Sequence, residues 1–204
     1  MIYNIYLNKI VKVFKLAVFI LIGPIGSGKS EAQDILEDKN FKCYCADKIV
    51  RNLYKRKDVI SEMKNIFPEY VEKEKINIKL IRNIIFTNIE KISKIEDFIQ
   101  PKVFTEFKKI IKENKNEKNL FLFFPVIKND KFIKKYKTIY IDSRSEIRKK
   151  RLEKRKNYNK DIINKIIEYQ DSIDFYKNNS NYYIQNNNSM SDFKKSIENL
   201  INEL

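Results

Sequence analysis

One stretch of the chain has the residue types and the spacing needed to bind phosphate. Residues 23–30 read Gly-Pro-Ile-Gly-Ser-Gly-Lys-Ser, which is a glycine, four residues, and then Gly-Lys-Ser. The chain contains 3 glycines, Gly23, Gly26 and Gly28, and all of them lie in this stretch. Glycine takes positive φ angles without strain and lets the backbone approach a ligand closely. The stretch therefore predicts a loop whose N–H groups surround phosphate oxygens at the start of a helix.

The two residues that end the loop indicate the kind of phosphate. In loops of this pattern the lysine, here Lys29, contacts the β- and γ-phosphates of a nucleotide, and the hydroxyl of the next residue, Ser30, binds Mg²⁺. We therefore expect ATP with Mg²⁺ as the ligand and phosphoryl transfer as the chemistry. The expected ATP-binding residues of the loop are Gly23, Ile25, Gly26, Ser27, Gly28, Lys29 and Ser30, with Lys29 also catalytic and Ser30 the metal ligand.

A carboxylate further along the chain is a candidate for the base. Asp47 follows the apolar residues 41–45, and the topology of a parallel sheet can bring it close to the phosphate loop. An aspartate in that place can accept the proton of an acceptor hydroxyl. The alternative is that Asp47 only caps the helix that follows.

Three arginines form a second candidate group. Arg148, Arg151 and Arg155 have spacings of three and four, so they share one face of a helix. A guanidinium group suits phosphate oxygens and can stabilise the charge that develops during transfer. The alternative is a solvated basic face, which is common in a segment with this many lysines.

Composition narrows the chemistry. The chain of 204 residues has no histidine, so no Ser-His-Asp triad and no imidazole metal site can form. Its formal net charge is +15, which suggests polyanionic partners or a basic surface without a specific partner. Cys43 and Cys45 are expected on one face of a strand, where they cannot form an ordinary disulfide, and this fits a reducing, intracellular setting.

Residues 1–15 contain no Asp or Glu and carry three lysines, as a targeting segment does. The apolar run that follows, 16–22, is too short to cross a bilayer and leads directly into the phosphate loop. We therefore expect an N-terminal extension over 1–15, a first buried strand over 16–22 and no membrane partner. A cytoplasmic location is expected, with organelle targeting left open.

The elements around these residues predict an α/β fold. Short apolar runs predict strands, and the amphipathic stretches between them predict helices, which implies βαβ units and a parallel sheet covered on both faces. From about 55 to about 118 the pattern is helical without a convincing strand, which predicts an insertion that shapes a substrate pocket. The expected strands are 16–22, 41–45, 120–124, 138–141 and 182–184, and the expected helices are 31–39, 46–54, 77–89, 96–111, 145–156, 161–176 and 191–204.

Taken in order, these motifs resemble dephospho-coenzyme A kinase, which phosphorylates the ribose 3′-hydroxyl of dephospho-CoA. The loop is similar to the family's Gly-Gly-Ile-Gly-Ser-Gly-Lys-Ser, and residues 46–51 are similar to its Ala-Asp-x-Ile-x-Arg. The resemblance covers about 16–200 and continues through later positions, which are Ile81, Arg82, Phe86 and Pro101, then 125–127, then Arg151, Arg155, Gln170, Ile184 and Asn186.

The resemblance implies roles for particular residues. Asp47 would be the catalytic base, with Arg51 and Arg82 also near the acceptor. Arg151 would be a catalytic lid arginine, Arg155 a second lid arginine at ATP, and Asn186 a residue near the adenine end of ATP.

The resemblance also implies a three-layer P-loop kinase core with a five-stranded parallel sheet, a helical CoA-binding insertion and a small lid. The expected single domain, 16–204, divides into a core of 16–54, 119–143 and 177–204, an insertion over about 55–118, and a lid over about 144–176.

The chain departs from the family pattern at five positions, which are Pro24, Glu31, Cys45, Gln100 and Asn129. None of them removes Lys29, Ser30 or Asp47, but they leave room for a slow enzyme, for one with an altered acceptor pocket, or for a nucleotide-binding relic without catalysis. Two other functions stay open. One is a different small-molecule kinase, such as a nucleoside monophosphate kinase. The other, suggested by the charge, is a nucleic-acid-binding protein switched by ATP, although we expect no nucleic-acid partner.

Overall fold

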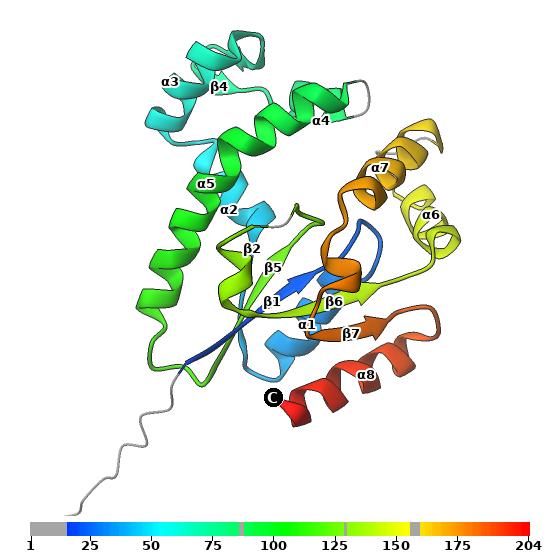
Figure 1. Ribbon diagram of the computed structural model, residues 1–204. Helices are drawn as coiled ribbons and strands as arrows, with labels where there is room; N and C mark the ends of the chain where they lie inside the picture. Colours follow the sequence, from blue (N-terminus) through cyan, green and yellow to red (C-terminus); the bar gives the residue numbers. More distant parts are fainter. Residues whose placement is uncertain (1–15, 86–87, 129, 156–159) are drawn as a thin grey trace, which may run out of the picture.

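A five-stranded parallel sheet forms the centre of the computed structural model (Figure 1). The structure describes residues 16–85, 88–128, 130–155 and 160–204, so the expected N-terminal extension, 1–15, and Asn129 lie outside it. The order across the sheet is β2-β5-β1-β6-β7, which puts the strand before the phosphate loop in the middle. The strands are β1 (Ala17–Ile22), β2 (Lys42–Cys45), β5 (Asn119–Phe124), β6 (Lys137–Asp142) and β7 (Tyr182–Gln185), close to the expected bounds.

The two faces of the sheet carry separate apolar cores because side chains alternate along a strand. In β1, Val18, Ile20 and Ile22 belong to one buried cluster, and Phe19 and Leu21 belong to another. The first cluster includes residues of the segment between β2 and β5, and the second includes residues of the first and last helices of the chain. The result is the predicted three-layer α/β fold.

Eight α-helices lie in the described part of the chain. Helices α1 and α8 cover one face of the sheet, whereas α2 and α5 pack on the other. Figure 1 shows α6 and α7 standing beside the carboxyl end of the sheet, opposite α4. The helices are α1 (Lys29–Asp38), α2 (Ala46–Leu53), α3 (Lys57–Ile66), α4 (Ile78–Ile85), α5 (Ile89–Glu113), α6 (Ser145–Glu153), α7 (Lys160–Ile173) and α8 (Met190–Glu203).

The segment between β2 and β5 is mostly helical, as predicted, but the sequence analysis missed two of its elements. One is helix α3, and the other is a hairpin of β3 (Val71–Glu72) and β4 (Lys75–Ile76). The hairpin turns through Lys73 and Glu74 with φ angles of 47° and 57°. Strands of two residues are too short to show any alternation of polar and apolar residues, so the expectation of no strand here was wrong.

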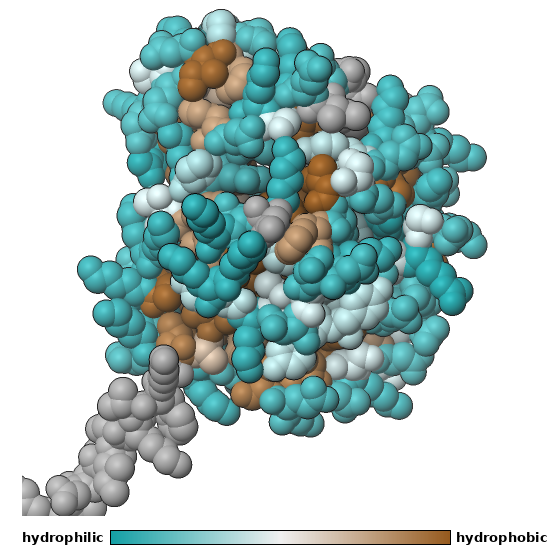
Figure 2. Space-filling model, viewed as in Figure 1, coloured by the Kyte–Doolittle hydropathy of each residue, from teal (hydrophilic) through white to brown (hydrophobic). Residues whose placement is uncertain are grey.

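The described surface is mainly polar. Figure 2 shows that hydrophilic residues cover most of the face turned to the viewer, with apolar residues in small groups. Among the described residues, no helix combines the length and the apolar composition needed to cross a lipid bilayer. The predicted division into core, insertion and lid stays a prediction, although α6 and α7 form the region expected to be the lid.

Candidate active site

The phosphate loop runs from the end of β1 into α1, and its backbone demands glycine. Gly28 lies just before α1 with a φ of 110°. A Cβ atom on Gly28 would also lie 2.1 Å from the side-chain nitrogen of Asn186. A side chain at this position would therefore be both strained and in collision. The first N–H groups of α1 are left free to bind an anion, and the helix dipole favours negative charge there.

Lys29 is held inside the loop. Its ammonium group donates hydrogen bonds to the carbonyl oxygens of Gly23, at 2.6 Å, and Pro24, at 3.0 Å. Burial lowers the pKa of Lys29 to about 8, while Asp47 and, less strongly, Cys45 act to raise this pKa. The Lys29 ammonium is therefore engaged by the loop in this structure, and the charge of Asp47 acts on it; its contact with a phosphate stays a prediction.

Asp47 lies in the first turn of α2, at the carboxyl end of β2. The residue before α2, at the N-cap position, is Cys45, so Asp47 is not the cap that the alternative interpretation required. Asp47 is exposed, and Arg51 is exposed one turn later on the same helix. Within the described part of the chain, neither side chain has a hydrogen bond or an ion pair. These two predicted acceptor-side residues therefore lie on the same helix, and the charge of Asp47 acts on Lys29.

The two predicted lid arginines are placed differently. The charge of Arg155 acts on Lys29 and lowers its pKa, and the Arg155 side chain is exposed just beyond α6. Arg151 instead points into the protein, where it donates to the carbonyl oxygen of Gly26 at 3.0 Å and to both oxygens of Asn186 at 3.1 Å. These contacts hold the loop from behind, which the sequence did not predict. The catalytic role of Arg151 stays a prediction.

Asn186 is also part of this support. It is buried, and its side-chain nitrogen donates to the carbonyl oxygen of Ser27 at 2.8 Å. Its backbone N–H donates to the carbonyl oxygen of Asp142, which joins the ends of β6 and β7. The amide of Asn186 is thus engaged by the protein itself, and its predicted contact near the adenine end of ATP stays a prediction.

The other predicted site residues include Ile25 and Ser30, at the phosphate loop, and Arg82, which is on a different helix. The N–H of Ile25 donates to the side-chain oxygen of Gln170 at 2.7 Å, so it is already engaged by the chain rather than directed at a phosphate. Ser30 is exposed in the first turn of α1, beside the loop. Arg82 lies in α4, and its contact with an acceptor stays a prediction.

Comparisons with known proteins identify the family. The family model described as dephospho-CoA kinase matches residues 17–192 of the chain. The chain belongs to the dephospho-CoA kinase family. It is 32% identical over 183 residues to the dephospho-CoA kinase of Fusobacterium nucleatum, a match that covers 87% of this chain and 93% of that protein.

Solved structures support the same family and fold. The dephospho-CoA kinase of Campylobacter jejuni is 25% identical, with a TM-score of 0.63, and the match covers 92% of this chain and 96% of that one. TT1252 of Thermus thermophilus has a TM-score of 0.76 at 18% identity, covering 93% of this chain and 98% of that one, and supports the fold alone. The P-loop kinase fold predicted from the sequence is therefore confirmed.

Residues with no predicted role also reach the loop. Gln170 fits the dephospho-CoA kinase pattern, but no role was predicted for it, and Asp171 was not among the predicted site residues. Both lie near the end of α7; Gln170 contacts the loop, and Asp171 contacts Arg148 of α6. No sequence pattern connects them to the loop, because each is a single polar residue in an amphipathic helix.

Proposed function

We propose that the chain transfers the γ-phosphoryl group of ATP to the ribose 3′-hydroxyl of dephospho-CoA. The observation that carries this proposal is an exposed carboxylate, Asp47, at the carboxyl end of β2, whose charge acts on Lys29 of the phosphate loop, in a chain of the dephospho-CoA kinase family. A phosphate loop alone explains how the phosphoryl donor, ATP, would bind. An exposed carboxylate near the loop can also accept a proton from the hydroxyl group of the acceptor.

In the proposed reaction, the 3′-hydroxyl oxygen attacks the γ-phosphorus and ADP leaves. Asp47 accepts the hydroxyl proton, so the new O–P bond forms as the O–H bond breaks. Lys29 and Arg155 supply positive charge to the transferring group and to the leaving phosphate. Asp47 is exposed and forms no hydrogen bond with any of the described residues, which leaves its carboxylate open to the acceptor hydroxyl on that part of the chain.

Mg²⁺ fits this site as a partner of the nucleotide. The described residues contain no group of three or more His, Cys, Asp or Glu side chains that could hold a metal ion by themselves. Mg²⁺ in phosphoryl-transfer sites commonly takes one or two protein oxygens, with phosphate oxygens and waters as its other ligands. The exposed hydroxyl of Ser30 is the proposed protein ligand, and the ion would screen the charge of the phosphates.

Arg51 and Arg82 are the proposed contacts for the acceptor. Arg51 shares α2 with Asp47, so a guanidinium contact to an anionic acceptor at Arg51 would place the hydroxyl beside the base. The proposed partners are small molecules, ATP and dephospho-CoA, with no nucleic acid and no membrane. A cytoplasmic location is part of the same proposal.

The decisive experiment offers the protein several acceptors. Purified protein is incubated with Mg-ATP and dephospho-CoA, AMP, CMP or shikimate in separate reactions, and phosphorylated products are identified by mass spectrometry. We expect a phosphorylated product only with dephospho-CoA, and the new phosphate should be on the 3′-oxygen of its ribose. No product should form when EDTA removes divalent ions. Turnover of AMP, CMP or shikimate without turnover of dephospho-CoA would overturn the proposal.

A second arm tests the charge-based rival. Titration with single-stranded RNA and duplex DNA at increasing salt measures whether the +15 charge produces specific nucleic-acid binding. We expect weak binding that ATP does not change. Tight binding switched by ATP, in a protein without turnover, would favour the nucleic-acid interpretation.

A further inference from the structure

Ile25, in the middle of the phosphate loop, is held by the lid region at two separate points. Its backbone N–H donates to the side-chain oxygen of Gln170 on α7 at 2.7 Å. Its side chain packs against a small buried cluster formed by Leu152 of α6 with Ile163 and Ile167 of α7. A hydrogen bond and an apolar contact therefore fasten the same loop residue to the same pair of helices.

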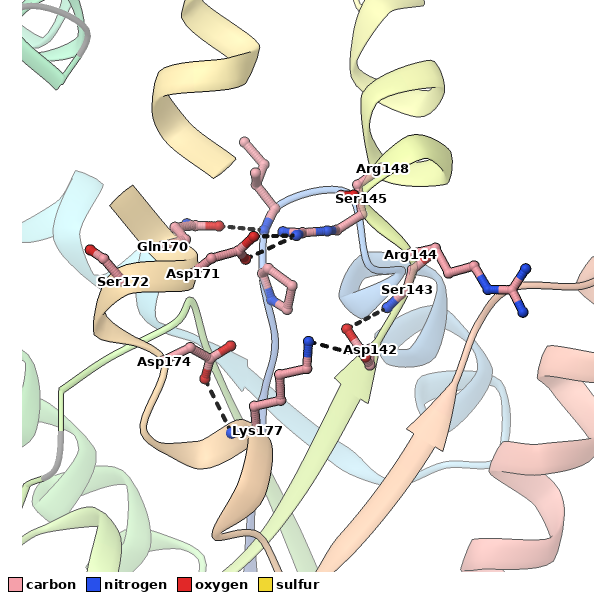
Figure 3. Close-up of polar contacts among 12 residues, drawn as sticks. Asp142, Ser143, Arg144, Ser145, Arg148, Gln170, Asp171, Ser172, Asp174 and Lys177 are labelled. Carbon is pink, nitrogen blue, oxygen red and sulfur yellow. Dashed lines mark hydrogen bonds and ion pairs between the residues drawn. The ribbon is translucent and has the colours of Figure 1, made fainter. Parts of the chain in front are cut away.

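Next to Gln170, an ion pair joins the two lid helices beside the loop. The Nη2 atom of Arg148 lies 2.9 and 3.2 Å from the two carboxylate oxygens of Asp171. Only 4% of the Arg148 side chain is exposed, and its Nε and Nη1 atoms have no hydrogen-bond partner in the described structure. Figure 3 shows Gln170 and Asp171 from α7 and Arg148 from α6 converging on the loop. When a buried charged group has a single charged partner, removal of that partner strongly lowers the stability of the fold.

The backbone of α6 touches the loop directly. At Gly26, where the φ angle is 78°, a Cβ atom would lie 3.2 Å from the carbonyl oxygen of Arg148 and 3.3 Å from its Cα. The loop therefore turns close against α6, and a Cβ atom at Gly26 would be in tighter than ordinary contact with the backbone of Arg148. A shift of α6 would therefore move the surface on which the loop rests.

The same turn of α7 also reaches the helix that borders the acceptor side. Tyr169 donates a hydrogen bond to a carboxylate oxygen of Glu96 in α5 at 2.6 Å. Consecutive helical residues point about 100° apart, so Tyr169, Gln170 and Asp171 face three different neighbours. One turn of α7 thus connects α5, the phosphate loop and α6.

We propose that Gln170 is a positioning residue for phosphoryl transfer. From its place on α7, next to the Arg148–Asp171 ion pair, the Gln170 side chain sets the shape of the phosphate loop. The phosphate loop then takes its nucleotide-binding shape only while α7 is docked, so nucleotide affinity depends on the position of the lid. The inference rests on the proposed function for its place in a reaction, but the coupling itself concerns the loop and α7.

The test compares three substitutions on one helix. Gln170→Leu removes the acceptor for the Ile25 N–H, Gln170→Glu keeps an acceptor oxygen, and Glu168→Leu introduces the same leucine at an exposed neighbouring position. Amide hydrogen exchange of Ile25 is measured by NMR in the protein without nucleotide. Calorimetric titration with Mg-ADP measures nucleotide affinity, and denaturant unfolding measures global stability.

We expect Gln170→Leu to speed exchange at Ile25 and to weaken Mg-ADP binding by about tenfold, the factor that loss of one hydrogen bond of ordinary strength produces. Exchange at Ile25 should stay within about twofold of wild type in Gln170→Glu, because the carboxylate still accepts the bond. Glu168→Leu should leave exchange and affinity unchanged.

The inference fails if Gln170→Leu lowers global stability while Ile25 exchange and Mg-ADP affinity stay at wild-type values, because the side chain would then only stabilise the fold. It also fails if Gln170→Glu loses protection at Ile25 as fully as Gln170→Leu does. Neither readout needs an acceptor or turnover. A protein that does not phosphorylate dephospho-CoA would overturn the proposed function and leave these results interpretable.

Discussion

The phosphate loop and the start of α2 meet at the same edge of the sheet, but the protein holds them in different ways. Arg151 and Asn186 donate side-chain hydrogen bonds to the loop, and the side chain of Gln170 accepts one from it; these residues come from α6, from the end of β7 and from α7. Asp47 and Arg51 are exposed and have no side-chain hydrogen bond within the described residues. The chain itself thus fixes the phosphate loop, whereas Asp47 and Arg51 present charges without described partners, as the proposed acceptor role of these two residues requires.

The largest expected effect tests the acceptor side. Asp47→Asn should reduce phosphoryl transfer by about 10² to 10⁴, the usual contribution of a general base, because the amide cannot take the proton. Binding of Mg-ADP should stay within about twofold, since Asp47 does not support the loop. Steady-state kinetics and calorimetry measure the two quantities, and Asp34→Asn, an exposed change on α1, is the matched control. Transfer near the wild-type rate would remove Asp47 from the role of base.

The second prediction tests the donor side through stability. Arg151→Met should lower the free energy of unfolding by about 1.5 to 3 kcal/mol, because charged hydrogen bonds to the loop and to Asn186 are lost. Arg155→Met should change it by no more than about 0.5 kcal/mol, because that side chain is exposed. Urea unfolding measures both. Equal effects of the two substitutions would contradict the contrast between the two arginines.

The third prediction tests the proposed contact between Arg51 of α2 and the acceptor. Arg51→Ala should raise the KM for dephospho-CoA by about tenfold, the size of one charge-assisted contact, and leave the KM for ATP unchanged. Lys48→Ala, an exposed charge on the same helix, provides the control. If the KM for ATP rises instead, Arg51 serves the donor side and the division between the two sides is wrong.

The smallest expected effect concerns the link between the two sides. Burial raises the pKa of Glu96, although its hydrogen bond with Tyr169 and the nearby Lys128 act to lower this pKa. A raised carboxyl pKa means that the folded protein favours the protonated form. Glu96 therefore contributes stability at low pH, and that contribution is lost as the pH rises from 4.5, the ordinary glutamate value, through the higher pKa of the folded state.

Glu96→Gln should remove this pH dependence. The difference in unfolding free energy between Glu96→Gln and wild type should shift in favour of the variant between pH 4.5 and neutrality. Glu90→Gln, an exposed change in the same helix, should show no such shift. Urea unfolding at the two pH values checks this, and a shift in the opposite direction would show that Glu96 is stabilised as a carboxylate.

The sequence predicts the parts of this molecule that depend on local patterns. The five strands follow from apolar runs, and the loop follows from three glycines, Lys29 and Ser30. Helix α3 and the hairpin through Lys73 were missed, because short elements leave little periodicity. The inward position of Arg151 was missed for another reason. Its helical spacing with Arg148 and Arg155 indicates a shared face, but spacing cannot tell whether that face meets solvent or the loop.

The contacts of Gln170 and Asn186 show the same limit. Each is a single polar residue whose partner lies far away in the sequence, and only the folded chain brings the pair together. The family resemblance singled out both residues in the sequence. It could not show that their amide groups are engaged by the loop itself.

The central position of β1 in the sheet has a consequence for when the phosphate loop takes its shape during folding. β1 pairs with β5 and β6, so Ala17 lies beside Asn119, and Phe19 lies beside Lys137. The loop that follows β1 is held by contacts from α6, α7 and the end of β7. Pairings between distant segments form slowly, because the intervening chain must be ordered first. The phosphate loop can therefore take the shape seen here only after Gln170 and Asn186, more than a hundred residues later in the sequence, have been synthesised and packed against it.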